Sequence, residues 1–287
     1  MILLIGDSGY IGHAFAQELR ERGLPFEGVS SKNFNYTDTA QLRRLISSAD
    51  FVINAAGYTG KPNVDACEQN KLATFQGNAC LPLQIAIVCE ECRVPFGHVS
   101  SGCIYQGNTL DGTGFTEQDA PNFCFSAQPC SWYSGTKAEG EKLLGMFPDK
   151  YVWRLRIPFD EYDNSRNYLS KIMRYDTLLN ATNSVSHRGD FVKACLDLYQ
   201  KRAAYGIYNV TNPGPVTTEG VVQQIKSILK PAKQFNFWAS DEEFYKYAAK
   251  TLRSNCVLNT SKLAAAGIKL RTAEEAIHAS LINWKPE

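Results

Sequence analysis

Short apolar runs alternate with amphipathic segments along the first 157 residues of the chain. The apolar runs predict strands at residues 2–6, 26–30, 51–57, 96–102 and 151–157. Apolar residues at helical spacing predict helices between them, at 10–23, near 38–47, at about 65–92 and at 133–147. Strands that alternate with helices are typical of a parallel sheet with both faces covered. The fold class is therefore α/β with a doubly wound parallel sheet.

The pattern becomes less regular after residue 158. Helices are predicted at 166–175, 191–202 and 218–229, and a strand at 206–212. We interpret 1–157 as one domain and 158–287 as a smaller lobe, some of whose segments return to the first domain. The polar stretch 106–131 is rich in Gly, Pro and Asn and predicts a long loop. Long loops in compact domains are often functional.

Composition narrows the class of protein. The 287 residues are 44% hydrophobic, which is ample for a buried core. The net charge is +1, with 30 basic and 29 acidic residues and no run of like charge. This balance argues against a nucleic-acid or membrane partner. The N-terminus is apolar for only five residues, so neither a signal peptide nor a membrane span is predicted there.

The nine cysteines bear on compartment and metal binding. They are odd in number and scattered, which favours free thiols in a reducing, cytoplasmic environment. Cys89 and Cys92 form a CxxC inside an apolar helical stretch, but no second pair supplies the remaining ligands of a zinc site. The four histidines show no ligand spacing either, so no metal is expected.

Glycines at the end of the first strand provide the first candidate site. In "GDSGYIG", Gly6, Gly9 and Gly12 lie between that strand and the following helix. Such a loop allows close approach of a pyrophosphate to the N-terminus of the helix. Within a βαβ pattern this predicts dinucleotide binding rather than a merely structural turn. Ser8, Tyr10 and Ile11 belong to the same loop.

The end of the second strand indicates which dinucleotide is used. An acidic residue there would bind the ribose 2′-hydroxyl of NAD, whereas a basic one accepts the 2′-phosphate of NADP. Here the residues are Ser30, Ser31 and Lys32, so NADP(H) is favoured over NAD(H). Asp38 follows and has two interpretations, a contact with adenine or a cap of the helix that begins beside it.

A tyrosine and a lysine form the second candidate site. "YSGTK" places Tyr133 and Lys137 four residues apart, on one face of a helix. A lysine in this position can lower the pKa of the phenol and hold a ribose. Tyr133 can then give its proton to an oxygen as a hydride arrives. Ser101, at the end of a predicted strand, is a candidate hydrogen-bonding partner.

These features resemble the extended short-chain dehydrogenase/reductase superfamily. The resemblance rests on Gly6, Gly9 and Gly12, on "NAAG" with Ala55, Ala56 and Gly57, and on Ser101, Tyr133 and Lys137. It extends over nearly the whole chain. It implies a Rossmann-type domain that binds NADP(H), a small C-terminal lobe that binds a nucleotide sugar, and a catalytic triad of Ser101, Tyr133 and Lys137.

Other segments resemble one group within that superfamily. "SSGCIY", "GKPNVDACE", "GFTEQDAPNF", "RNYLSKIMRY" and "YNVTNPG" are similar to the bifunctional nucleotide-rhamnose synthases. These are 3,5-epimerase/4-reductases that act on a nucleotide-linked 4-keto-6-deoxyglucose, and the dTDP-4-dehydrorhamnose reductases are related to them. By resemblance the expected substrate is the UDP form, and the product a nucleotide-L-rhamnose.

Epimerisation needs an acid and a base that plain reduction does not need. Cys103 lies two residues beyond Ser101, so both point into one cleft if the segment is extended. A thiol stays protonated near neutrality and yet gives up its proton readily. By resemblance Lys171 is the base, which requires a lowered pKa. Arg174, one helical turn away, is expected to lower it.

Several alternatives stay open at this stage. Cys103 has the alternative of a buried packing thiol, and Lys171 that of a solvated lysine. The chain could be a monofunctional reductase, a GDP-fucose-synthase-like enzyme, or a regulatory subunit that binds NADP without turnover. Arg166, Asn167 and Asn122 are expected substrate contacts, and a homodimer is a further expectation. UDP, dTDP and GDP are not distinguished by the residues themselves.

Overall fold

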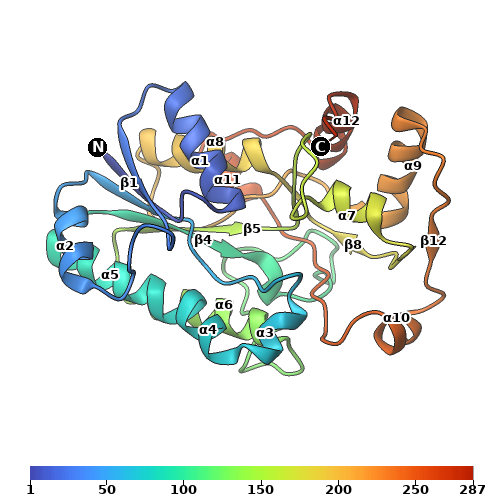
Figure 1. Cartoon of the computed structure of the whole chain (residues 1–287), viewed down its shortest axis with the longest axis horizontal. Coiled ribbons are helices and arrows are strands. Elements are labelled where there is room, and N and C mark those ends of the chain that lie inside the picture. The colour runs from blue at the N-terminus through green and yellow to red at the C-terminus, as the bar shows by residue number, and fades with distance from the viewer. Residues whose placement is uncertain (287) are drawn as a thin grey trace.

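A six-stranded parallel sheet forms the centre of the computed structural model, which describes residues 1–286 (Figure 1). The strand order is β10–β5–β4–β3–β1–β2. The strands are β1 (Ile2–Ile5), β2 (Phe26–Val29), β3 (Phe51–Asn54), β4 (Phe96–Ser101), β5 (Lys150–Leu155) and β10 (Gly206–Asn209). The strand order reverses between β1 and β3, and parallel sheets bind ligands at such a switch point. The expected doubly wound α/β class is confirmed.

Helices cover both faces of this sheet (Figure 1). On one face, α1 (Tyr10–Glu21) packs on α8 (Arg188–Gln200). On the other, α5 (Leu81–Cys92) packs between α2 (Thr39–Ser47) and α6 (Trp132–Leu144). Alternate residues of β1 enter the two cores, with Leu4 in the first and Leu3 in the second. Burial on both faces explains why this strand is apolar at every position.

The long helix expected over 65–92 is not continuous. It comprises α3 (Asp65–Gln69), α4 (Lys71–Phe75), the π-turn η1 (Gln76–Cys80) and α5. The break lies at Asn70, whose ψ of 52° is not helical. Within the π-turn, the Asn78 side chain accepts a hydrogen bond from the Tyr58 amide (2.9 Å) and donates one to its carbonyl (2.9 Å). A π-turn is a frequent feature of functional sites.

One helical run passes a length and composition test for a membrane span. Lys71–Cys92 has 22 residues and a mean hydropathy of 1.4, and half of it is buried inside the protein. Because helices that cover a sheet pass the same test, the result is weak evidence for a span. The run includes α5, which packs against the core of the sheet.

Other elements end earlier than the sequence pattern predicts. β3 ends at Asn54, where the side chain turns back to accept a hydrogen bond from the Ala56 amide (3.0 Å). β4 ends at Ser101, and Gly102–Ile104 forms the 3₁₀-turn η2. In both places polar side chains bind the backbone of the residues that follow. The chain therefore leaves the sheet where the site residues begin.

The second half of the chain builds a smaller lobe, seen on the right of Figure 1. Its helices are α7 (Tyr168–Arg174), α9 (Thr218–Leu229), α10 (Asp241–Tyr247) and α12 (Ala273–Ile282). Three two-stranded sheets join them: β6 (Pro158–Phe159) with β9 (Ser186–His187), β8 (Thr182–Asn183) with β11 (Val216–Thr217), and β7 (Thr177–Leu178) with β12 (Asn236–Phe237). α7, α9 and α12 share one apolar core. The sequence pattern had not indicated α10, α12 or most of these short strands.

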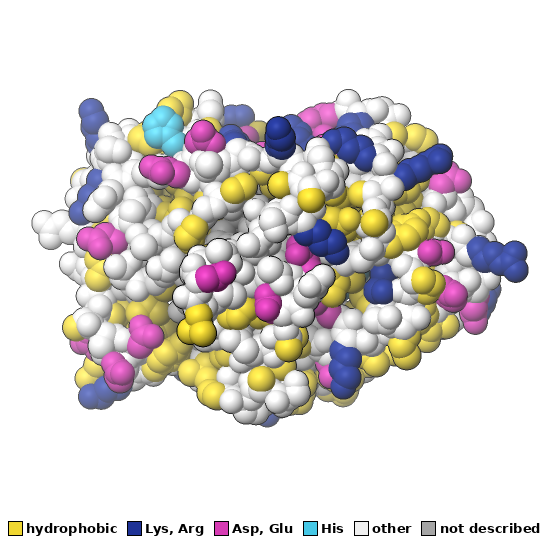
Figure 2. All heavy atoms as spheres, turned by 180° about the vertical axis from the view of Figure 1, so that it is seen from behind, with side chains coloured by type: hydrophobic (Ala, Val, Ile, Leu, Met, Phe, Trp, Pro, Cys, Tyr) yellow, Lys and Arg dark blue, Asp and Glu magenta, His cyan; other side chains and the backbone are white. Residues whose placement is uncertain are grey.

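Some of the second half returns to the central sheet. β10 pairs with β5, and Tyr208 of β10 lies in the same core as Phe191 of α8. Leu263 of α11 (Ser261–Ala265) also belongs to that core. The interpretation of 158–287 reaches residue 287, which lies outside the described residues. On the face shown in Figure 2, acidic and basic side chains are interspersed.

Candidate active site

The glycine loop is shaped by two close approaches. Gly6 has φ +88°, and a Cβ there would lie 2.6 Å from the Ala56 nitrogen. A Cβ on Gly12 would lie 1.9 Å from the Gly6 oxygen. Both positions therefore exclude a side chain. The N-cap of α1 is Gly9, which offers no side-chain hydrogen bond, so the first N–H groups of the helix are available to an anion. This arrangement fits a dinucleotide pyrophosphate.

The other expected cofactor residues lie around the same edge of the sheet. Ser8 follows β1, Ser30–Lys32 follow β2, and Ala55–Gly57 follow β3; Tyr10 and Ile11 open α1. Ser31 and Lys32 are exposed, whereas Ser30 is buried and donates its amide to the Asn33 side chain (2.8 Å). The carboxyl ends of neighbouring parallel strands meet at one edge, which places these residues at the switch point.

Two acids near this edge refine the sequence interpretation. Asp38 caps α2, because its carboxylate accepts hydrogen bonds from both the amide (2.9 Å) and the side chain (2.7 Å) of Gln41. This supports the second of its two interpretations. Sequence reasoning missed Asp7, whose carboxylate lies against Gly28 of β2 and has one oxygen buried without a hydrogen bond. Its position within the glycine loop is the sequence feature that could have drawn attention to Asp7.

Tyr133 lies in α6, in contact with the apolar cluster that contains Cys103. Burial raises the pKa of its phenol, and the Cys103 thiol acts in the same direction. A hydrogen bond from Ser101 and the charge of Arg156 lower this pKa. We had expected the lowering to come from Lys137. The groups that lower it are instead Ser101 and Arg156, and burial still leaves the pKa of the phenol raised overall.

Lys137 is buried beside the expected cofactor loop. Its side chain is 5% exposed, and its Nζ donates a long hydrogen bond of 3.4 Å to the Val99 carbonyl. A Cβ on Gly57 would lie 3.3 Å from this Nζ. Burial lowers the pKa of Lys137. The ammonium therefore lies where it can meet a ribose bound against the 55–57 segment.

A buried ion pair positions α6. Glu141 of α6 accepts hydrogen bonds from the Arg154 guanidinium of β5 at 2.7, 3.0 and 3.2 Å. The Ser100 hydroxyl of β4 donates to the same carboxylate (2.5 Å). Two neighbouring strands thus hold the helix that carries Tyr133 and Lys137.

Cys103 lies in a turn and not in an extended segment. Its amide donates to the Ser101 hydroxyl (3.2 Å), which brings the two residues together although the expected strand geometry is absent. The thiol is buried beside Leu258 and Cys256. Burial raises its pKa, which hydrogen bonds with Ser101 and Ser134 and the charges of Arg156 and Lys137 lower in turn.

Lys171 lies on α7, where burial lowers its pKa. The charges of Arg166 and Arg253 lower the pKa further. The expectation that Arg174 would do this is wrong: Arg174 pairs with Asp163 (2.9 Å), and the acting charges come from two other parts of the chain. A lowered pKa favours the neutral amine that a base requires.

The segment 59–68 connects these groups. Arg166 donates to the Thr59 hydroxyl (3.0 Å) and the Gly60 carbonyl (2.9 Å). Arg253 makes a two-pronged ion pair with Asp65 (2.8 and 2.9 Å). Burial raises the pKa of the Cys67 thiol in the same segment to about 11. Cys103 also raises this pKa, and the charge of Arg166 lowers it. Cys67 therefore lies near both Cys103 and Arg166, and Arg166 in turn acts on Lys171.

Two expected substrate contacts, Asn167 and Asn122, make hydrogen bonds within the protein. Asn167 is completely buried and caps α7: its oxygen accepts from Leu169, and its nitrogen donates to the Asp160 and Tyr162 carbonyls. These hydrogen bonds give Asn167 a structural role, and its contact with substrate stays a prediction. Asn122 is exposed, but both ends of its amide bind the Gln106 backbone (2.8 and 3.0 Å). It closes the long loop.

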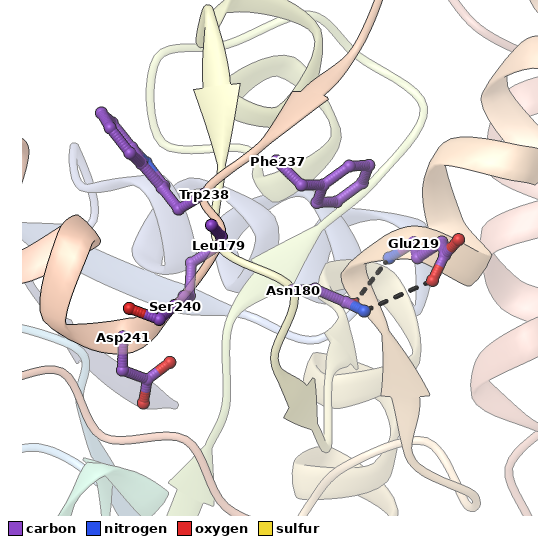
Figure 3. A pocket seen from close by; sticks show the side chains of 8 residues that line it. Leu179, Asn180, Glu219, Phe237, Trp238, Ser240 and Asp241 are labelled. Atoms are coloured by element: carbon purple, nitrogen blue, oxygen red, sulfur yellow. Dashed lines mark hydrogen bonds between the residues drawn. The ribbon is translucent and has the colours of Figure 1, made fainter.

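The smaller lobe contains a cavity of about 390 Å³ (Figure 3). Leu179 and Asn180 follow β7, Glu219 lies in α9, and Phe237 ends β12. Asn180 and Glu219 hold each other across it through hydrogen bonds of 3.2 and 3.4 Å. Figure 3 shows Phe237 and Trp238 pointing to opposite sides of their strand. The walls of the cavity thus combine the aromatic ring of Phe237 with the hydrogen-bonded pair of Asn180 and Glu219.

The cysteines are neither paired with one another nor grouped with other metal-binding side chains. All nine are free thiols, and Cys89 is buried in α5. Among residues 1–286, no three or more His, Cys, Asp or Glu side chains form a group that could hold a metal ion.

Fold and glycine loop together define a Rossmann-type dinucleotide-binding protein. Residues 1–285 match the family of the RmlD substrate binding domain, and the chain belongs to that family. The identified superfamily resemblance is confirmed.

Two curated relatives from Arabidopsis thaliana are similar over most of this chain. A bifunctional dTDP-4-dehydrorhamnose 3,5-epimerase/dTDP-4-dehydrorhamnose reductase is 30% identical, with 96% of this chain and 90% of that protein covered. A trifunctional UDP-glucose 4,6-dehydratase/UDP-4-keto-6-deoxy-D-glucose 3,5-epimerase/UDP-4-keto-L-rhamnose-reductase is 32% identical over 91% of this chain. The chain spans only 39% of that protein's length.

Solved structures show the same fold. The L780 UDP-rhamnose synthase from Acanthamoeba polyphaga mimivirus superposes with a TM-score of 0.89 at 26% identity, covering 99% of each chain. A dTDP-4-dehydrorhamnose reductase from Bacillus anthracis in complex with NADP has a TM-score of 0.81 at 18% identity, covering 98% of this chain and 97% of that one.

Proposed function

We propose that the chain is a bifunctional 3,5-epimerase/4-reductase that converts a nucleotide-linked 4-keto-6-deoxyglucose to the nucleotide-L-rhamnose with NADPH. The observation that carries this proposal is the placement of a buried thiol, Cys103, beside Ser101 and Tyr133. The lowered pKa of the Lys171 amine on α7 adds to it. A reductase alone has use for Ser101 and Tyr133 but not for the thiol and the amine.

The reduction uses the residues of β4 and α6. NADPH, when bound, supplies the hydride for the C4 carbonyl carbon. Tyr133 donates its proton to the carbonyl oxygen, and burial supports this role by keeping the phenol protonated through its raised pKa. Ser101 hydrogen-bonds the same oxygen, and Lys137 holds the ribose against the 55–57 segment.

The inversion uses Cys103 and Lys171. The 4-keto group acidifies the hydrogens on C3 and C5. Lys171, whose lowered pKa favours the neutral amine, removes the proton from one face of the ring. Cys103, kept protonated by its raised pKa, gives a proton to the other face. The two groups thus meet the opposite requirements of a base and an acid.

The nucleotide is proposed to be uridine diphosphate. Support comes from the names of the mimivirus and trifunctional relatives, whereas the bifunctional relative is named for dTDP. Arg166 is kept as a proposed substrate contact, because its guanidinium lies between Lys171 and the 59–60 loop. The cavity beside Phe237 is a candidate for the nucleoside end, since it lies in the smaller lobe, which also carries Lys171.

Deuterium incorporation tests the proposal. UDP- and dTDP-4-keto-6-deoxyglucose are each incubated with the protein in D₂O, with and without NADPH. Deuterium at C3 and C5 without NADPH is expected, followed by reduction when NADPH is added. If no deuterium enters and yet a pre-epimerised sugar is reduced, the bifunctional proposal is wrong.

Two variants are expected to separate the half-reactions. Cys103→Ala should slow deuterium incorporation by about 10²–10⁴-fold, the usual contribution of an acid–base residue, and spare reduction of pre-epimerised sugar. Tyr133→Phe should do the reverse. Loss of both activities in both variants would contradict the assignment of separate roles.

A monofunctional reductase is the second candidate. The observation in its favour is that Cys103 packs with Leu258 and Cys256, as an inert thiol would. The same experiment distinguishes the two, because a monofunctional enzyme incorporates no deuterium. If neither sugar is consumed although NADPH binds tightly, a regulatory subunit is favoured, whereas a GDP sugar would be consumed by a fucose-synthase-like enzyme.

Three further expectations are kept as proposals. Residues 1–157 bind NADP(H), and most of 158–287 binds the nucleotide sugar. A cytoplasmic location is supported by the nine free thiols. The homodimer stays a prediction, to be tested by light scattering.

A further inference from the structure

Arg156 is a buried cation without an anion. It directly follows β5, its side chain is 5% exposed, and its Nη2 donates to two uncharged oxygens, Oδ1 of Asn183 and the Ser254 carbonyl. Its Nε is buried and has no hydrogen-bond partner. Among residues 1–286 no carboxylate forms an ion pair with this guanidinium. Arg154, two residues earlier, has such a partner in Glu141.

An unpaired charge in a protein interior is costly. Water is lost from the guanidinium, and only an opposite charge or a full set of hydrogen bonds offsets that loss. Arg156 has neither, since one donor is unused and its bound acceptors are neutral. Such a residue is expected where a negative charge forms during function.

The surroundings of Arg156 indicate where that negative charge forms. A Cβ on Gly102 would lie 3.5 Å from the Arg156 Cδ, and Gly102 separates Ser101 from Cys103. The groups that its charge favours in ionised form are Cys103, Tyr133 and Tyr168. All three are weak acids that burial keeps neutral at rest. The guanidinium therefore faces groups that become anions only when they lose a proton.

We propose that Arg156 is a positioning residue of the inversion, in that it stabilises the thiolate that Cys103 becomes when it protonates the substrate. This rests on the proposed function. In that step the S–H bond of Cys103 breaks, the proton forms a C–H bond at the ring carbon of the enolate, and the electron pair stays on sulfur. The proton that Lys171 removed from the opposite face returns through solvent to restore the thiol.

Other groups face the same thiol from the elements packed around it. Ser101 ends β4, and Ser134 and Lys137 belong to α6; each favours the thiolate. Tyr133 of α6 and Cys67 of α3 are weak acids that oppose a second negative charge. Cys130 of the long loop acts in the same way. Lys137 is the other nearby cation, and its own lowered pKa weakens it in that role.

The test titrates Cys103 in the absence of substrate. Thiolate formation is followed by ultraviolet absorbance against pH, as the difference between each protein and its Cys103→Ser counterpart. Arg156→Gln, which removes the charge but keeps an amide donor for the Asn183 and Ser254 oxygens, is expected to move the midpoint upward by about one pH unit or more. Arg156→Lys retains the charge and should keep the midpoint close to that of the wild type.

Asn183→Asp provides a second variant that leaves Arg156 in place. The new carboxylate neutralises the guanidinium with almost no change in shape, so the same upward movement of the midpoint is expected even if Arg156→Gln fails to fold. In either variant, deuterium incorporation at neutral pH should fall, by up to about ten-fold for each pH unit by which the midpoint rises. An unchanged midpoint in folded Arg156→Gln or in Asn183→Asp would overturn the proposal. If the wild type incorporates no deuterium, the epimerase function fails and with it a role of Arg156 in the inversion. The titration then still decides whether Arg156 stabilises the Cys103 thiolate.

Discussion

Lys171 illustrates how single residues acquire their chemistry here. Its lowered pKa results first from burial and then from the charges of Arg166 and Arg253. Arg253 is separated from it by more than half of the smaller lobe in sequence, and Arg166 lies on the preceding turn. Arg174, its neighbour on the helix, forms an ion pair with Asp163 instead. Sequence proximity was thus a poor guide to electrostatic proximity.

The pH dependence of deuterium incorporation checks this account. Because the neutral amine is the base, the rate should rise with pH through the pKa of Lys171. Removing a nearby positive charge in Arg166→Met raises that pKa, so the rising limb should move to higher pH. Arg166→Lys keeps the charge and should restore the limb, and Arg174→Met should leave it in place. If the rising part of the pH–rate profile does not move in Arg166→Met, this electrostatic role of Arg166 is ruled out.

At the scale of elements, the position of α6 depends on a buried ion pair. Glu141 and Arg154 have side chains that are 6% and 3% exposed, and they connect the helix of Tyr133 to β5. Ser100 adds a bond from β4. A buried pair contributes little net stability, but loss of one partner leaves the other uncompensated. The position of α6 therefore depends on both partners of this pair.

Chemical denaturation measures this dependence. Glu141→Gln leaves Arg154 buried without its anion and is expected to lower the free energy of unfolding by about 3–5 kcal/mol. Glu91→Gln is the matched control, because Glu91 pairs with Arg43 on the surface, where the side chains are 45% and 48% exposed. The control should cost less than about 1 kcal/mol. Equal losses in the two variants would contradict the role of burial.

At the scale of the whole molecule, the two halves of the sequence share one core. Phe191 of α8 and Tyr208 of β10 come from the second half, but they pack with Phe15 and Trp153 of the first. β10 also covers the edge of β5 through four residue pairs. The sheet is therefore incomplete in the first 157 residues alone.

A fragment of residues 1–157 is accordingly expected not to fold. It would expose the apolar face of Trp153 and the unpaired edge of β5. Circular dichroism and denaturant titration should show no cooperative transition, in contrast to the full chain. A cooperative transition in the fragment would show that the returning segments are dispensable.

The sequence by itself determined the features that depend on neighbours along the chain. Apolar periodicity predicted all six strands of the parallel sheet, and the glycine spacing and the four-residue interval from Tyr133 to Lys137 predicted the two parts of the reductase site. These follow from local geometry, which the repeat of strand or helix dictates. The helix break at Asn70 and the turn at Cys103 were missed. The turn is held by a hydrogen bond outside the periodic pattern, from the Cys103 amide to the Ser101 hydroxyl.

Only the tertiary structure decided which charges meet. It brought the charges of Arg166 and Arg253 to bear on Lys171 and held the Asn167 amide in a helix cap. It also buried Arg156 without a counter-charge beside Gly102. Electrostatic energy depends on the separation of groups in space and on their burial, and neither quantity is encoded in residue spacing along a chain. The type of chemistry could therefore be predicted from the sequence, whereas the pKa shift of each group depends on the fold.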